Sequence, residues 1–88
     1  MKIKDGFILR EVAGTYIALA TGDLSKKYKG SLTLNSSAKF LFENMKEETT
    51  KEQLVAKMLE HFDDLDEKTA TNAVEKFVSK LQEENLID

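Results

Sequence analysis

The 88-residue sequence contains no cysteine, no proline and no tryptophan. Without cysteine, a disulfide-stabilised scaffold and a zinc site with thiolate ligands are both excluded. No apolar run approaches the roughly 20 residues that a membrane-spanning helix needs. The first residues also lack the apolar core of a signal peptide. We therefore expect a cytoplasmic protein that does not enter a membrane.

The side chains that usually carry catalysis are scarce as well. His61 is the single histidine, and nothing near it in the sequence forms a nucleophile–base pair. The four glycines are too scattered for a phosphate-binding loop. An EF-hand interpretation starting at Asp64 would place Lys68 among the calcium ligands and Thr69 where glycine is needed, so it fails. We predict that the protein is not an enzyme and uses no cofactor or metal.

Charge is divided unevenly along the chain. Residues 1–35 carry six basic and three acidic side chains, whereas residues 36–88 carry seven basic and 13 acidic ones. The second part is therefore net negative and would repel a phosphate backbone, unlike most nucleic-acid-binding surfaces. Solvated helix faces are the simplest explanation of these acidic residues. A chain of 10.0 kDa has room for one domain, which we assign to residues 1–88.

The first third of the chain is typical of β-structure. Residues 6–12 and 15–20 are rich in strand-forming side chains, and Ala13-Gly14 between them fits a tight turn, which predicts a hairpin. Residues 21–30 are polar and are expected to form a loop. Residues 31–34 alternate polar and apolar side chains, which predicts a third strand.

The third strand is the best candidate for an exposed sheet edge. Leu32 and Leu34 should point inward, and Ser31 and Thr33 should point outward. Neither outward side chain is charged or proline, so neither blocks pairing with another strand. Such an edge can bind an extended peptide by strand addition, or it can be an ordinary edge protected by its shortness.

Three amphipathic helices are expected after residue 35. Apolar side chains recur there at intervals of three and four residues. Candidate N-caps precede each helix, and Asn85 followed by Leu86 fits the end of the last one. The caps are Asn35 or Ser36, Thr50 with Gln53, and Asp66. The chain therefore predicts one α+β domain in which a three-stranded antiparallel sheet is followed by three helices (βββααα).

Three segments together resemble the PqqD-like family, named for pyrroloquinoline quinone synthesis protein D. Residues 31–43, SLTLNSSAKFLFE, resemble the family signature LN-x-T/S-A-x-x-L-W. Residues 6–14 are similar to the first hairpin of the family, and residues 77–87 to its closing F-x-x-x-L-x-x-x-G-L-I. Phe42 stands where tryptophan is common, and Asn85 stands where glycine is common. These departures leave the subfamily open, including whether the chain serves pyrroloquinoline quinone synthesis.

The resemblance implies a winged-helix-like, non-catalytic domain that binds the leader segment of a ribosomally made precursor peptide. In the family, the leader adds as a strand to the third β-strand and lies beside the third helix. A separate modifying enzyme, often of the radical S-adenosylmethionine class, then acts on the peptide. The binding residues implied here are Lys29, Gly30, Ser31, Leu32, Thr33, Leu34, Thr71, Val74, Glu75 and Val78.

Two other functions compete with this peptide-binding adaptor. A hairpin with three helices is also compatible with a winged-helix DNA-binding protein. The predicted third helix has no arginine, however, and Arg10 is the only arginine in the chain, so a helix cannot read guanine through a bidentate arginine contact. The exposed edge could alternatively pair with a second copy, giving a homodimer or a structural subunit.

Overall fold

The chain forms a three-stranded antiparallel sheet in the order β1-β2-β3, with β1 (Phe7–Val12), β2 (Thr15–Ala20) and β3 (Ser31–Leu34). The computed structural model describes residues 1–28 and 30–87. Ala13 and Gly14 join β1 to β2 with φ angles of 52° and 81°, the two positive values that a type I′ turn requires. The predicted hairpin and third strand are thus confirmed.

The segment expected to be a loop contains a short helix, α1 (Gly22–Lys27). Leu24 is its buried residue, and it packs against the backbone of Gly6, where an added Cβ would lie 3.0 Å from the Leu24 Cβ. Asp23 in the first turn and Lys26 in the last turn suit the helix dipole. One buried apolar residue in so short a helix produces no periodicity, and the sequence pattern therefore missed it.

Three longer helices follow the sheet, namely α2 (Ser36–Asn44), α3 (Lys51–His61) and α4 (Glu67–Glu83). Each begins after a predicted cap. The Asn35 side chain accepts the Ala38 N–H at 2.8 Å, which identifies Asn35 as the cap of α2. The Asp66 carboxylate accepts the Thr69 N–H at 2.7 Å at the start of α4.

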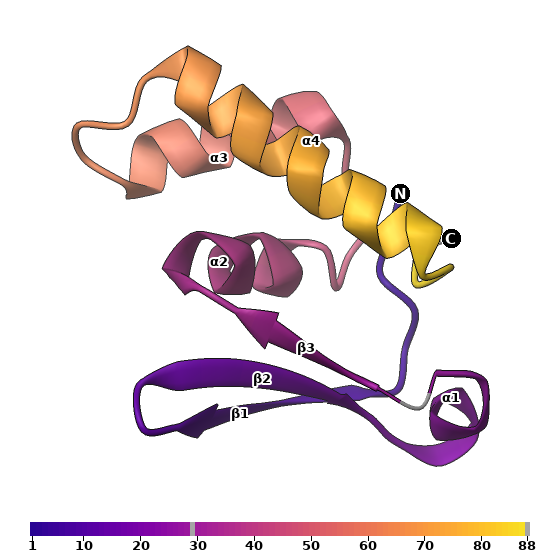
Figure 1. The fold of residues 1–88 in the computed structure, drawn as a ribbon. Helices are drawn as coiled ribbons and strands as arrows, with labels where there is room; N and C mark the ends of the chain where they lie inside the picture. The colour runs from indigo at the N-terminus through magenta and orange to yellow at the C-terminus, as the bar shows by residue number, and fades with distance from the viewer. Residues whose placement is uncertain (29, 88) are drawn as a thin grey trace.

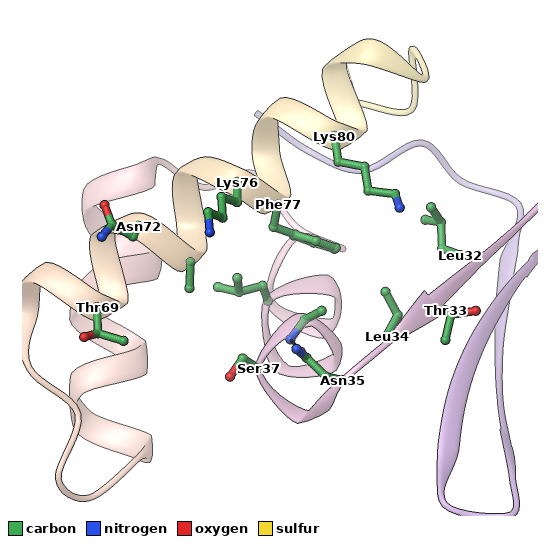
Figure 2. Close-up of a pocket in the computed structure, with 13 residues that line it drawn as sticks. Leu32, Thr33, Leu34, Asn35, Ser37, Thr69, Asn72, Lys76, Phe77 and Lys80 are labelled. Carbon is green, nitrogen blue, oxygen red and sulfur yellow. Dashed lines mark hydrogen bonds between the residues drawn. The ribbon is translucent and has the colours of Figure 1, made fainter.

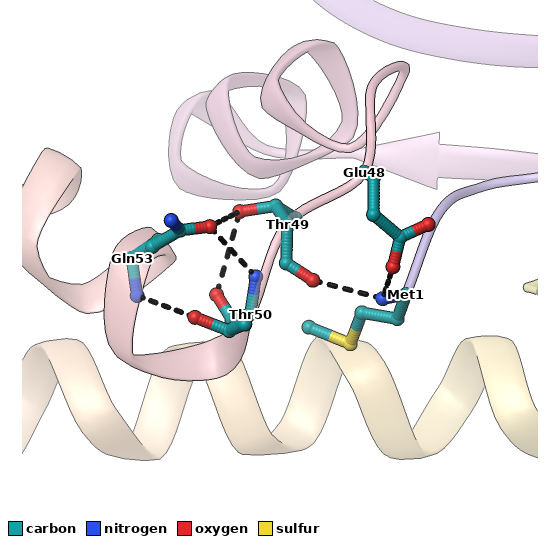
Figure 3. Close-up of polar contacts among 5 residues, drawn as sticks. All are labelled: Met1, Glu48, Thr49, Thr50 and Gln53. Carbon is teal, nitrogen blue, oxygen red and sulfur yellow. Dashed lines mark hydrogen bonds and ion pairs between the residues drawn. The ribbon is translucent and has the colours of Figure 1, made fainter.

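The capping box at the start of α3 is complete (Figure 3). The Gln53 N–H donates to the Thr50 hydroxyl oxygen, and the Thr50 N–H donates to the Gln53 side-chain oxygen, both at 3.1 Å. The Met1 ammonium group donates to the Thr49 carbonyl at 2.8 Å and pairs with the Glu48 carboxylate. These contacts hold the N-terminal segment against the connection between α2 and α3.

The segment after α4 turns back into the core, as the sequence predicted. Asn85 adopts the left-handed conformation, with a φ of 57°. The Leu86 N–H donates to the Leu81 carbonyl at 2.8 Å, and the Leu86 side chain is buried. Ile87 then forms an antiparallel bridge with Ile3, which brings the two ends of the chain together.

Helices α2, α3 and α4 lie on the same side of the sheet (Figure 1). The core lies between these helices and the inner face of the sheet. The opposite face of the sheet leaves Ile8, Val12 and Leu19 exposed. Within the described ranges, no helix is long and apolar enough to cross a membrane. The most deeply buried side chains include Ala18, Leu32, Leu41, Phe42, Met45, Leu54, Met58, Ala70, Val74, Val78 and Leu81.

Candidate functional site

The hairpin turn determines which backbone groups of β3 face the open edge. In a two-residue type I′ hairpin, the residues that flank the turn, Val12 and Thr15, form a hydrogen-bonded pair. Such pairs alternate along an antiparallel ladder, so Thr15, Ile17 and Leu19 direct their backbone groups towards β1. Ala18 therefore directs its N–H and C=O towards β3, where it lies opposite Leu32.

Ser31 and Thr33 consequently point their N–H and C=O groups away from β2, towards the open edge. Their side chains are exposed, whereas Leu32 and Leu34 are buried with exposed fractions of 2% and 3%. The predicted alternation is confirmed. The edge thus presents the outward backbone groups of Ser31 and Thr33 directly beside two apolar side chains of the inner face.

Tyr28 closes one end of this edge. Its hydroxyl group donates to the Ser31 carbonyl at 3.3 Å, and its ring packs edge-on against Phe7. Burial raises the pKa of Tyr28, and the nearby Glu84 carboxylate raises the pKa further. A Cβ at Gly30 would lie 3.4 Å from the same hydroxyl oxygen. Beyond Tyr28, Thr33 retains both of its outward backbone groups for a partner strand.

A groove of about 540 Å³ runs between β3 and α4 (Figure 2). Its apolar surface comes from all three neighbouring elements, β3, α2 and α4. Figure 2 shows the Lys80 side chain extending from α4 towards Leu32, while Ser37 and Thr69 lie at the far end of the groove. The residues that line it are Leu32, Thr33, Leu34, Asn35, Ser37, Ala38, Leu41, Thr69, Asn72, Ala73, Lys76, Phe77 and Lys80.

The structure brings part of the predicted site together. Leu32, Thr33 and Leu34 line the groove, and Ser31 extends the same open edge. Gly30 is exposed and adjoins the strand at the Tyr28 end. Lys29, which was also assigned to the site, lies outside the described residues.

The four predicted residues of the last helix do not line this groove. Val74 and Val78 are buried in the core, with exposed fractions of 0% and 1%. Thr71, Val74 and Glu75 instead line a second hollow of about 430 Å³, together with α3 residues such as Val55. Helical periodicity shows which residues share a face, but packing decides which flank of the apolar stripe turns towards the sheet.

The α4 side of the groove is formed by residues that the sequence interpretation missed. Asn72, Ala73, Lys76, Phe77 and Lys80 lie on one face because they are spaced three or four residues apart. Phe77 belongs to the apolar stripe, and Lys76 and Lys80 adjoin it. The sequence marks them only as one of the two polar borders of that stripe, and it does not indicate which border meets the sheet.

The groups considered for catalysis do not meet in the groove. The His61 ring stacks on Phe40 with a centroid separation of 4.4 Å and contacts the edge of Phe62. This packing accounts for the single histidine at the end of α3. Among the residues that the structure describes, no group of three or more His, Asp or Glu side chains could hold a metal ion.

Comparisons with known proteins concern the fold and the family of the chain. A solved structure described as "TbiB1 in Complex with the TbiA(beta) Leader Peptide" has a similar fold, with a TM-score of 0.74 and 16% sequence identity. The alignment covers 100% of this chain and 95% of that one. No curated protein matches the sequence at a significant level. The sequence model of the family described as coenzyme PQQ synthesis protein D matches residues 6–87, nearly the whole chain, and the chain therefore belongs to the PqqD family.

Proposed function

We propose that this protein is an adaptor that captures the leader segment of a ribosomally synthesised precursor peptide by strand addition to β3. The observation that carries the proposal is Thr33, whose outward N–H and C=O adjoin an apolar groove of about 540 Å³. Main-chain hydrogen bonds at such an edge give affinity, and the neighbouring groove gives specificity. The PqqD family assignment and the likeness to a structure that contains a leader peptide support it.

The register defines how an added antiparallel strand would lie. Its residue opposite Thr33 exchanges both backbone hydrogen bonds and points its side chain to the outer face of the sheet. The residues on either side of it lie opposite Leu32 and Leu34 and point their side chains into the groove. Every second leader residue therefore points its side chain into the groove. Two such side chains, one opposite Leu32 and one opposite Leu34, can contact the groove at the same time.

The adaptor does not need catalytic groups for this role. Holding a flexible substrate close to a separate modifying enzyme raises the effective concentration of the substrate without new chemistry. A disordered leader loses conformational entropy when it is ordered as a strand, so we expect moderate affinity. The modifying enzyme is expected to be of the radical S-adenosylmethionine class, as is common in the family.

An amide NMR titration tests the proposal directly. The probe is the N-terminal segment of a short peptide encoded next to the gene for this protein. Since the chain lacks proline, every residue after Met1 has a backbone amide that can report binding. We expect chemical-shift changes along residues 30–34 and at Ala73, Lys76 and Phe77, and none at the α3 residues Val55 and Leu59.

Shifts confined to the α3 side, or to the outer sheet face around Ile8 and Leu19, would refute strand addition at β3. Light scattering over a concentration series accompanies the titration. If the free protein is a dimer and the shifts at residues 30–34 depend on protein concentration rather than on peptide, the edge pairs with a second copy. That result would replace the adaptor by the homodimer alternative.

A further inference from the structure

We propose that Lys76 and Lys80 make the groove selective for acidic leaders. The substrate class is a leader segment whose groove-facing positions combine an apolar side chain with at least one aspartate or glutamate. This inference rests on the proposed function and assigns to it a specificity determinant.

The two lysines occupy equivalent places one helical turn apart on α4. Both are exposed, both line the groove, and Figure 2 shows the Lys80 side chain reaching across it towards Leu32. The floor between them is apolar and includes Phe77 and Ala73. A groove-facing leader side chain opposite Leu32 therefore enters a space bounded by hydrocarbon below and an ammonium group at the rim.

Within the described part of the chain, no ion pair neutralises the positive charges of Lys76 and Lys80. Among the described residues, neither Lys76 nor Lys80 has a carboxylate within 4.0 Å, whereas Lys39 pairs with Glu43 at 3.9 Å. None of the described residues that line the groove is acidic. Lys76 and Lys80 also line a second, shallow hollow, which they share with Glu75, Glu83 and Glu84. The two lysines therefore lie between this acidic hollow and the groove.

The described side chains that line the groove carry a positive net charge, whereas the helical layer around it has a negative net charge. Residues 36–88, which include the helical layer, carry seven basic and 13 acidic side chains. This surface at large attracts basic peptides, but the groove would place a basic leader side chain beside two ammonium groups. Like charges at close range oppose binding, so the lysines both favour acidic leaders and exclude basic ones.

The competing explanation is that the lysines only cover Phe77 with their hydrocarbon stems. Lys→Met substitutions separate the two roles, since methionine keeps an unbranched apolar chain and removes the charge. Charge reversal at both positions, Lys76→Glu with Lys80→Glu, gives the strongest test. The matched control is Lys57→Glu with Lys68→Glu, which makes the same change in net charge at exposed lysines outside the groove.

The probe is a display library of random twelve-residue peptides selected on the wild-type protein, on the charge-reversed variant and on the control variant. We expect aspartate and glutamate to be enriched at positions two residues apart on the wild type and the control, and lysine and arginine on the reversed variant. A selected acidic peptide should bind the reversed variant about tenfold more weakly in low salt, with a smaller difference in 0.5 M salt, because partly exposed charges are screened. The double Lys→Met variant should lose part of this affinity.

Three results would overturn the inference. The first is a set of enriched peptides with no acidic excess, and the second is the same acidic excess on the charge-reversed variant. If the selected peptides in either case bind a Thr33→Pro variant more weakly than the wild type, the proposed function stands and only the lysine assignment fails. The third is that no peptides are enriched, or that the enriched peptides bind the Thr33→Pro variant as tightly as the wild type. This result refutes the proposed function together with the inference.

Discussion

Replacing Thr33 by proline should weaken leader binding while the domain stays folded. Proline has no N–H, and the register places the Thr33 N–H on the open side of β3, so the bond lost is one to the ligand and not one to β2. Proline is tolerated on edge strands where the N–H faces solvent, and the preceding Leu32 already has the extended conformation that proline favours.

The magnitude follows from the hydrogen bonds involved. Losing one main-chain hydrogen bond costs about 0.5–1.5 kcal/mol where water can replace it, but about 1–3 kcal/mol where the leader carbonyl is left unpaired beside the groove. Because the carbonyl would lie beside an apolar groove, we expect a loss of about 1–3 kcal/mol, which corresponds to a roughly fivefold to 150-fold higher Kd. Thr33→Ala keeps the N–H and removes only an exposed side chain, so its Kd should stay close to that of the wild type.

Isothermal titration calorimetry with the leader peptide measures both variants, and circular dichroism checks that they are folded. A folded Thr33→Pro protein with wild-type affinity would refute the assignment of the free edge. An equal loss for Thr33→Ala would show that the side chain, and not the backbone donor, is recognised. Leader peptides with single N-methylated residues extend the test, since strand addition predicts sensitivity at every second position.

Two further predictions concern stability. Leu41→Ala should lower the free energy of unfolding by about 2–5 kcal/mol in urea denaturation, because Leu41 lies in the core and is only 1% exposed. The control variant Leu59→Ala, at a position that is 37% exposed, should change the free energy of unfolding far less. Equal effects of the two substitutions would contradict the described core. Hydrogen bonds from Thr69, first from its side chain and then from its backbone N–H, lower the pKa of Asp66. The Asp66 charge therefore stabilises the fold above the pKa of about 3.9 that Asp has in the unfolded chain, and this stabilisation is lost as the pH falls through the lower pKa of the folded state. The thermal stability advantage over Asp66→Asn should therefore be constant from pH 5 to 7 and shrink below pH 4, and an advantage that does not shrink as the pH falls below 4 would contradict this cause.

Features that depend on neighbours a few residues apart were predictable from the sequence. The caps at Asn35, Thr50 and Asp66 each involve a bond to a residue three positions later, so the spacing alone defines them. The left-handed Asn85 follows from the same kind of local pattern. By contrast, α1 buries Leu24 beside Gly6, which lies 18 positions earlier in the chain, and local patterns carry no sign of this contact.

The candidate site was predictable on the strand side and not on the helix side. In a strand of period two, once Leu32 and Leu34 are assigned to the core, Ser31 and Thr33 must face outward. A helix offers two flanks beside its apolar stripe, and the pattern treats them equally. The sequence interpretation chose Thr71 and Glu75, but the flank that meets β3 carries Lys76 and Lys80.

Local residue patterns are enough to predict the α+β class, the order of the three strands and the three long helices, and the inward face of β3, because caps, turn residues and hydrophobic periods act over a few residues. Long-range packing, in contrast, decided that α4 lies across α3 and α2 with its Lys76 flank towards the sheet. It also decided that the Thr33 backbone faces an open groove, since that depends on ladder pairing between β1, β2 and β3. The physical reason is that side-chain pattern specifies what must be buried, whereas the rotation of a helix about its axis is chosen by how all the buried side chains pack together.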